Sequence, residues 1–296
     1  LLLAAACAPG RPEGTARRGP GEAPAAHGPA LPGSAVAGPD LPDPDAPIPG
    51  GAERLARALA GTTERLRSAI DAWIARGDTG RWPPPRDVVL LALHQQRIYR
   101  ELGAHPRLLR RVLPLLPGWL RSEARANAGA HAALLSLLPD RITSTPDLRT
   151  RPPLPADVLL GYYREAERRF GVDWEVLAAV NMVESRFGRV RSASSAGARG
   201  PMQFIPSTWR AYGLGGDVHD DRDAILGAAN YLAASGAPQD YRRALYAYNH
   251  AWAYVRAVLL YARQMMRDPR DFYAYYNWQV YVATPTGSER LTGPGA

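Results

Sequence analysis

The sequence contains no lysine, and all 36 of its basic residues are arginine. Alanine, glycine and proline are abundant, so the composition indicates a genome rich in G and C. The formal net charge of +8 favours an anionic partner. However, the arginines are scattered without interleaved aromatic residues, and no nucleic-acid-binding motif is present. Nucleic acid is therefore not an expected partner.

The only cysteine is Cys7, which excludes an internal disulfide. No apolar run reaches the roughly 18 residues of a membrane-spanning helix. Residues 1–7, LLLAAAC, look like the end of a signal-peptide apolar region. Small residues before a cysteine resemble a bacterial lipoprotein cleavage box, in which Cys7 becomes the lipid anchor. The alternative is a cysteine inside an ordinary signal peptide.

The length of 296 residues predicts two folded units and a tail. Residues 8–50 are rich in proline and glycine and poor in large apolar side chains, so we expect a disordered tether. Helical periodicity follows, interrupted by a proline-rich linker. We expect a signal-peptide remnant at residues 1–7, the tether at 8–50 and a small helical accessory domain at 51–140. The linker at 141–155, a second helical domain at 156–283 and a tail at 284–296 should follow.

The fold class is expected to be mainly α, because apolar residues recur with helical spacing in both folded units. One long apolar stripe is expected to be strongly buried and predicts a single helix, or two with a break near Asn249. It consists of Tyr241, Leu245, Tyr248, Trp252, Val255 and Leu259. Only residues 278–282 have a β-like pattern, which predicts a small strand or hairpin.

Glu184 lies at the edge of an apolar helical stripe formed by Val176, Val180, Val183 and Phe187. The helix is expected to begin after Asp173 and to stop at Gly188, which places Glu184 on its last turn. Partial burial disfavours the charged carboxylate, and so does the C-terminal end of the helix dipole. Both effects raise the pKa of Glu184, as a general acid requires near neutral pH.

A loop of small residues, serine and arginine follows this helix. Gly197 and Gly200 allow backbone conformations or close approaches that a side chain would block. Gln203 then stands in an apolar run, and Pro206 predicts the first turn of another helix. An acid, hydroxyls and an amide beside aromatic residues are the parts of a carbohydrate site.

Three ordered motifs carry a family resemblance: ES at 184–185, SxxGAxGxMQFxPxTW at 194–209 and AYN at 247–249. Together they resemble the catalytic domain of lytic murein transglycosylases, which share the goose-type lysozyme fold, over roughly residues 155–268. The second unit is thereby identified as a lysozyme-like catalytic domain. The resemblance implies Glu184 as the catalytic acid and substrate-binding roles for Ser194, Met202, Gln203, Tyr248 and Asn249.

This chain departs from the family pattern at two positions. Pro201 replaces the usual Leu or Ile and lacks a backbone N–H donor, and His250 replaces a small residue. We expect altered contacts with substrate from both, and no loss of chemistry.

The resemblance implies cleavage of peptidoglycan at the β-1,4 bond between N-acetylmuramic acid and N-acetylglucosamine. Glu184 would act first as acid and then as base, and the sugar's own 6-hydroxyl would close a 1,6-anhydromuramyl end. No metal, nucleotide or other cofactor is implied. The expected partner is the peptidoglycan glycan strand, and the expected location is the bacterial cell envelope, with membrane contact only through Cys7.

Two alternatives remain open. A hydrolase of the same fold would use one of four acids to activate water, although their simplest role is to form a loop and a helix cap: Asp217, Asp220, Asp221 and Asp223. The second alternative is a non-catalytic wall-binding scaffold, and the presence of Glu184 is evidence against it. Ser185 is expected to bond backbone at the helix end, and the Tyr248 hydroxyl either packs or points at Glu184.

Overall fold

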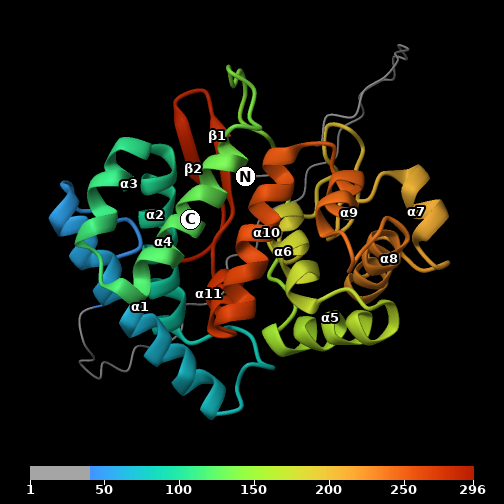
Figure 1. The fold of residues 1–296 in the computed structure, drawn as a ribbon, viewed down its shortest axis with the longest axis horizontal. Coiled ribbons are helices and arrows are strands. Elements are labelled where there is room, and N and C mark those ends of the chain that lie inside the picture. The colour runs from blue at the N-terminus through green and yellow to red at the C-terminus, as the bar shows by residue number, and fades with distance from the viewer. Residues whose placement is uncertain (1–40) are drawn as a thin grey trace, which may run out of the picture.

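The structure is a computed structural model that describes residues 41–296, and this part of the chain is mainly helical (Figure 1). Cys7 and residues 8–40 of the predicted tether lie outside the described residues. The elements are α1 Ala52–Ala75, α2 Arg86–Ala104, α3 Pro106–Val112, the 3₁₀ turn η1 Leu113–Leu115, α4 Gly118–Leu135, α5 Ala156–Phe170, α6 Trp174–Ser185, α7 Pro206–Tyr212, α8 Asp221–Ala234, α9 Tyr241–Tyr248, α10 Trp252–Arg267, α11 Arg270–Tyr276, β1 Tyr281–Thr284 and β2 Gly287–Arg290.

The mainly α fold class expected from the sequence is confirmed. Residues 41–50, the end of the predicted tether, lie against the helices. Leu41 and Ile48 pack on the apolar core, and the Arg97 guanidinium donates a hydrogen bond to the Pro44 carbonyl at 2.7 Å. Ordered contacts therefore begin before α1.

Helices α1–α4 share one apolar core with the C-terminal helices. Helix α4 packs on α10, and α1 packs on α11. Trp73 of α1 is 1% exposed and lies edge-on to Tyr273 of α11, with ring centroids 5.6 Å apart. The first and last parts of the described chain thus exclude water from a common interior.

Helix α6 lies at the centre of the second unit, surrounded by α5, α8, α10 and α11. Every residue of α6 except Glu175 is buried, which explains why its sequence is apolar all round. Phe272 of α11 makes edge-to-face contacts with Tyr163, Trp174 and Phe187. This aromatic cluster fixes α6 against its neighbours.

The long apolar stripe divides into α9 and α10, with the break at Asn249–Ala251. The expectation that Trp252 belongs to a buried stripe is wrong, because its side chain is 56% exposed. The extended residues at the break change the rotational phase of the second helix. Tyr254, which the stripe omitted, is fully buried instead.

A hairpin of β1 and β2 closes the described chain, with Tyr281 opposite Arg290 in antiparallel register. Gln96 of α2 fixes its base, donating to the Gln279 carbonyl at 2.9 Å and accepting from the Gln279 N–H at 2.8 Å. The sequence predicted β structure here, although β2 lies within the predicted tail and α11 was not anticipated. None of the described helices has both the length and the apolar character needed to span a membrane.

Replacement of Trp73 by alanine should test the shared core. Removing a fully buried indole leaves a cavity, so we expect the free energy of unfolding to fall by about 3–5 kcal/mol, in one transition. Trp119→Ala is the matched control, because Trp119 is 44% exposed, and its effect should be much smaller. Urea unfolding followed by circular dichroism measures both. Equal effects of the two substitutions would contradict this packing.

Candidate active site

Glu184 lies on the last turn of α6 and is only 5% exposed. Burial raises its pKa to about 8, while a hydrogen bond from Tyr254 partly opposes the rise. The Tyr254 hydroxyl donates to Glu184 Oε1 at 2.7 Å. Since the pKa lies above 7, the carboxyl carries its proton at neutral pH. The predicted direction of the shift agrees with the structure, although the side chain is drier than the sequence suggested.

The chain reverses immediately after Glu184 and Ser185. Arg186, Phe187 and Gly188 take left-handed conformations, with φ of 54°, 59° and 74°. A Cβ on Gly188 would lie 2.6 Å from Asp221 Oδ1, so only glycine fits there. The helix thus ends at Ser185, three residues before the predicted stop, and Glu184 stays on its final turn.

Buried hydrogen bonds fasten the motif loop to α6. Ser185 Oγ donates to the Pro201 carbonyl and accepts from the Gly188 N–H at 2.9 Å. Asn181 Nδ2 also donates to the Pro201 carbonyl, at 2.8 Å, and Tyr163 orients Asn181 through its Oδ1 at 2.6 Å. The expectation that Ser185 bonds backbone is confirmed. Asn181 was not anticipated, because a lone polar residue in an apolar helix is a weak sequence signal.

Gln203 presents a free acceptor in this loop. Its Nε2 donates to the Gly200 carbonyl at 2.9 Å, whereas Oε1 is buried and has no hydrogen-bond partner among residues 41–296. Gly200 has a φ of 74°, and a Cβ there would meet the Val218 carbonyl at 1.8 Å. The close approach expected at Gly200 therefore exists. A buried acceptor without a partner is costly unless a ligand satisfies it.

Tyr248 connects α9 to the motif loop. Its hydroxyl donates to the Met202 carbonyl at 2.7 Å, and Met202 itself is fully buried. The possibility that Tyr248 points its hydroxyl at Glu184 is therefore not realised, since Tyr254 provides that contact. Asn249 is buried at the break between α9 and α10. Tyr254 could have been found from its place five residues after Asn249, once the helical phase restarts.

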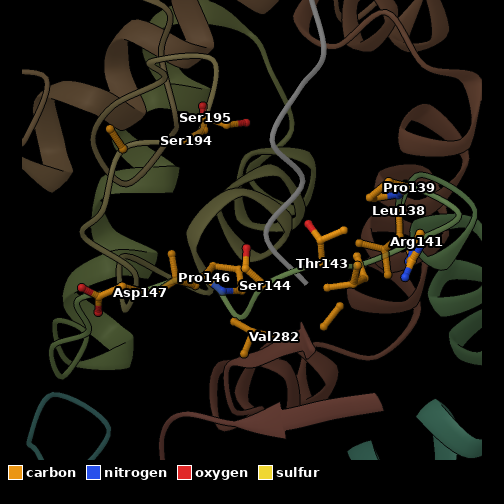
Figure 2. Close-up of a pocket in the computed structure, with 14 residues that line it drawn as sticks. Leu138, Pro139, Arg141, Thr143, Ser144, Pro146, Asp147, Ser194, Ser195 and Val282 are labelled. Carbon is orange, nitrogen blue, oxygen red and sulfur yellow. The ribbon is translucent and has the colours of Figure 1, made fainter. Parts of the chain in front are cut away.

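Ser194 lies on a pocket of about 420 Å³, separate from the helix end (Figure 2). Its Oγ accepts from the Ala198 N–H at 3.0 Å, which leaves the hydroxyl proton free to donate elsewhere. Figure 2 shows Ser194 and Ser195 across the pocket from Leu138 and Arg141. The walls come from residues 138–148, from the loop at 193–195 and from β1.

Strand β1 relates this pocket to Glu184. Val280, just before β1, lines a small cavity together with Glu184, and Val282 lines the pocket of Figure 2. Side chains two residues apart in extended chain project to the same side. The small cavity at Glu184 and the pocket of Figure 2 thus lie along one side of residues 280–282. The sequence pattern did not indicate that these residues line either of them.

The acidic cluster that follows the motif loop has structural roles. Asp220 caps α8 by accepting from the Asp223 N–H at 2.9 Å. Asp223 accepts from the Asp217 N–H at 3.0 Å. Asp221 pairs with Arg151 and is nearly buried, so that it ties α8 to the residues before α5. The loop and cap expected from the sequence are present. Within residues 41–296, no three His, Cys, Asp or Glu side chains are grouped as metal ligands.

Comparison with known proteins agrees with this geometry. Residues 161–267, which include Glu184, match the family model "Transglycosylase SLT domain", and this match identifies the second unit as lysozyme-like. Residues 161–267 of the chain thus form an SLT transglycosylase domain, and the two named relatives are lytic murein transglycosylases.

Two relatives align with about a third of the chain. It is 34% identical over 100 residues to the membrane-bound lytic murein transglycosylase F of Thiobacillus denitrificans, covering 34% of this chain and 18% of that protein. It is 30% identical over 119 residues to the membrane-bound lytic murein transglycosylase F 1 of Alkalilimnicola ehrlichii, covering 38% of this chain and 24% of that protein. The alignments thus span less than a quarter of each relative. No solved structure gave a significant match.

The pH dependence of stability should report the buried carboxyl. The pKa of Glu184 is raised in the folded state. Its contribution to the free energy of unfolding is therefore fully present below about pH 4.5 and is lost as the pH rises to about 8. Each unit of difference corresponds to about 1.4 kcal/mol at most. We therefore expect Glu184→Gln to become progressively more stable than the parent between these values.

Chemical unfolding at a series of pH values measures this difference. In Tyr254→Phe the decline in the free energy of unfolding should continue to higher pH, because the hydrogen bond that is lost favoured the charged form of Glu184. A constant difference between parent and Glu184→Gln over the whole range would show that Glu184 is solvated.

Proposed function

We propose that this chain is a peptidoglycan lytic transglycosylase that cleaves the β-1,4 bond between N-acetylmuramic acid and N-acetylglucosamine and leaves a 1,6-anhydromuramyl end. The observation that carries the proposal is the buried carboxyl of Glu184, protonated at neutral pH, within residues matched to the SLT domain. The names of the two relatives support the same substrate class.

The absence of a paired carboxylate supports this reaction over ordinary glycoside hydrolysis. Most glycosidases use two carboxyl groups, about 5–9.5 Å apart. Among the described residues, burial and the Tyr254 hydroxyl account for the pKa of Glu184, and no charged neighbour contributes. The reaction must then draw its second reactive group from the substrate itself.

In the first step Glu184 donates its proton to the glycosidic oxygen, and the bond from that oxygen to the muramyl anomeric carbon breaks. N-acetylglucosamine leaves as an alcohol. The muramyl N-acetyl carbonyl stabilises the positive charge that develops at the anomeric carbon. The Glu184 carboxylate left behind accepts the Tyr254 hydrogen bond, which favours the charged form.

In the second step the Glu184 carboxylate removes the proton from the muramyl 6-hydroxyl, whose oxygen attacks the anomeric carbon. The 1,6-anhydro ring closes and Glu184 regains its proton. Because nucleophile and electrophile belong to one sugar, attack is effectively unimolecular and competes well with water. The dry surroundings of Glu184 favour the same outcome.

Two features support contacts with the sugars. The partnerless Gln203 Oε1 can accept a hydrogen bond from an acetamido N–H. The pocket of Figure 2, at about 420 Å³, lies in the range of small-ligand sites and offers the Ser194 hydroxyl. We assign it to the part of the glycan strand next to the cleaved bond.

The contacts of the acidic cluster favour internal attack over water activation. Asp217, Asp220, Asp221 and Asp223 each cap, pair or turn the backbone, so a structural role already accounts for each. The non-catalytic scaffold alternative does not explain a carboxyl whose pKa is raised by burial.

Glu184→Gln preserves shape and burial but removes the transferable proton. We expect wall-lysing activity to fall by at least about 10²–10⁴-fold, because both proton transfers use this group. Mass analysis of the soluble products from purified walls should show parent-enzyme muropeptides lighter by one water than hydrolysis products.

The matched control is the double variant Asp217→Asn, Asp220→Asn, which should retain anhydro products at a modestly lower rate, because it weakens only the loop and cap. Products reducible with borohydride, lost in that double variant, would identify water as the nucleophile and the protein as a lysozyme.

We also propose that the protein is exported to the bacterial cell envelope and anchored through a lipidated Cys7. This rests on the run of apolar and small residues before Cys7 and on the printed names of the relatives, which describe those proteins as membrane-bound. In a precursor with its full signal peptide, Cys7→Ala should move the protein from the membrane fraction to the soluble fraction. Cys7→Ser serves as a second variant without a thiol. Unchanged membrane fractionation of both would refute the anchor.

A further inference from the structure

Trp252, the first residue of α10, is one of the large apolar side chains that remain exposed. The ring stacks on Tyr246 with centroids 4.4 Å apart and planes 25° from parallel. The Arg242 guanidinium lies 5.5 Å from the same ring. Tyr246 and Arg242 are four residues apart and so lie on one face of α9. With both contacts in place, the Trp252 side chain is still 56% exposed.

A groove of about 440 Å³ extends from this ring along the outer face of α10. It is lined by Arg242, Trp252, Val255, Arg256, Leu259, Leu260 and Arg263. Figure 1 shows α10 between α4 and α9, and the side chains of Arg256 and Leu260 approach Gly129 of α4. Tyr254, two residues after Trp252, is turned by about 200° around the helix axis. The groove therefore faces away from Glu184.

The groove carries uncompensated positive charge. Residues 241–267 contain five arginines and no aspartate or glutamate. Among the ion pairs of the described residues, none includes Arg242, Arg256 or Arg263. An apolar floor with cations on its rim favours a ligand that combines apolar surface with negative charge.

We propose that this groove is a second binding site, for a glycan strand that bears carboxylates, separate from the site at Glu184. A sugar places the weakly positive C–H hydrogens of its flat face on the exposed part of the Trp252 ring, which is electron-rich. Carboxylates carried by the strand pair with Arg256 and Arg263. The identity of the strand as peptidoglycan rests on the proposed function, whereas the groove and its charge do not.

Such a site would hold an insoluble strand while the cleaved bond lies elsewhere. Two sites on one protein raise the local concentration of the polymer at Glu184, so retention on walls exceeds what either site provides alone. Tyr246 and Arg242 fix the ring before binding, which lowers the entropy cost of stacking.

The test uses the full chain carrying Glu184→Gln, so that walls are bound but not digested. Sedimentation with purified insoluble walls measures the dissociation constant. Addition of Trp252→Ala should weaken binding about ten-fold, and Arg256→Ala with Arg263→Ala by a similar factor that shrinks as salt rises. Trp252→Phe should restore most of the affinity. Arg243→Ala removes an exposed arginine of α9 outside the groove and should change nothing.

Unchanged wall binding of Trp252→Ala would overturn the proposal, and so would equal losses in Arg243→Ala and Arg256→Ala. Equal affinity of the parent for uncharged N-acetylglucosamine oligomers would overturn the role of carboxylates. Binding to phosphatidylglycerol vesicles in preference to walls would assign the groove to a lipid surface instead.

The experiments distinguish the second binding site from the proposed catalytic function. Wall cleavage by the parent enzyme without Trp252-dependent binding supports the function and removes the second site. Trp252-dependent binding without any cleavage by the parent enzyme supports the second site and removes the function. Thermal unfolding of each variant confirms that the substitution leaves the fold intact, as expected for exposed side chains.

Discussion

Exclusion of water from the Glu184 carboxyl is the constraint on which the rest of the site depends. No neighbouring charge assists the shift in its pKa, so the proton is held by burial alone, against a single opposing hydrogen bond from Tyr254. The acidity is therefore a property of packing. Helix α6 must be enclosed by α5, α8, α10 and α11, and Phe272 joins several of these elements through aromatic contacts. A defect that lets water reach the carboxyl would lower its pKa and weaken the acid, even far from the substrate.

The second constraint is the sharp reversal of the chain after α6. Left-handed backbone at Arg186 and Phe187 is unfavourable for residues with side chains and persists only where the surroundings hold it. Those surroundings are the buried bonds from Ser185 and Asn181 to the Pro201 carbonyl. The reversal carries the motif loop back against α6, so that the acceptor of Gln203 and the carboxyl of Glu184 belong to one rigid assembly. Pro201 makes these contacts through its carbonyl, so they do not require the N–H that proline lacks.

Much of this arrangement could be predicted from local sequence. Helical periodicity located helices before and after the linker. The order of the three motifs predicted Glu184 as the acid and indicated the family of the SLT domain. The misses have a common physical cause. Tyr254 and Val280 approach Glu184 through tertiary packing, which produces no periodic pattern in the sequence. The extended residues after Asn249 change the helical phase, so the assumption of one continuous stripe wrongly predicted that Trp252 is buried. Residues 138–148 form a pocket wall only because the hairpin and the loop at 193–195 approach them. Sequence patterns report which face of an element is apolar, but not which distant segment covers it.

The match to the SLT domain ends at residue 267, while Val280, Val282 and residues 138–148 lie on either side of the matched region. The unit that is shared among relatives is thus smaller than the unit that encloses the acid. Redesign for a different cleft should accordingly alter these flanks and leave residues 161–267 unchanged, whereas excision of the matched domain by itself would open one side of the carboxyl to solvent.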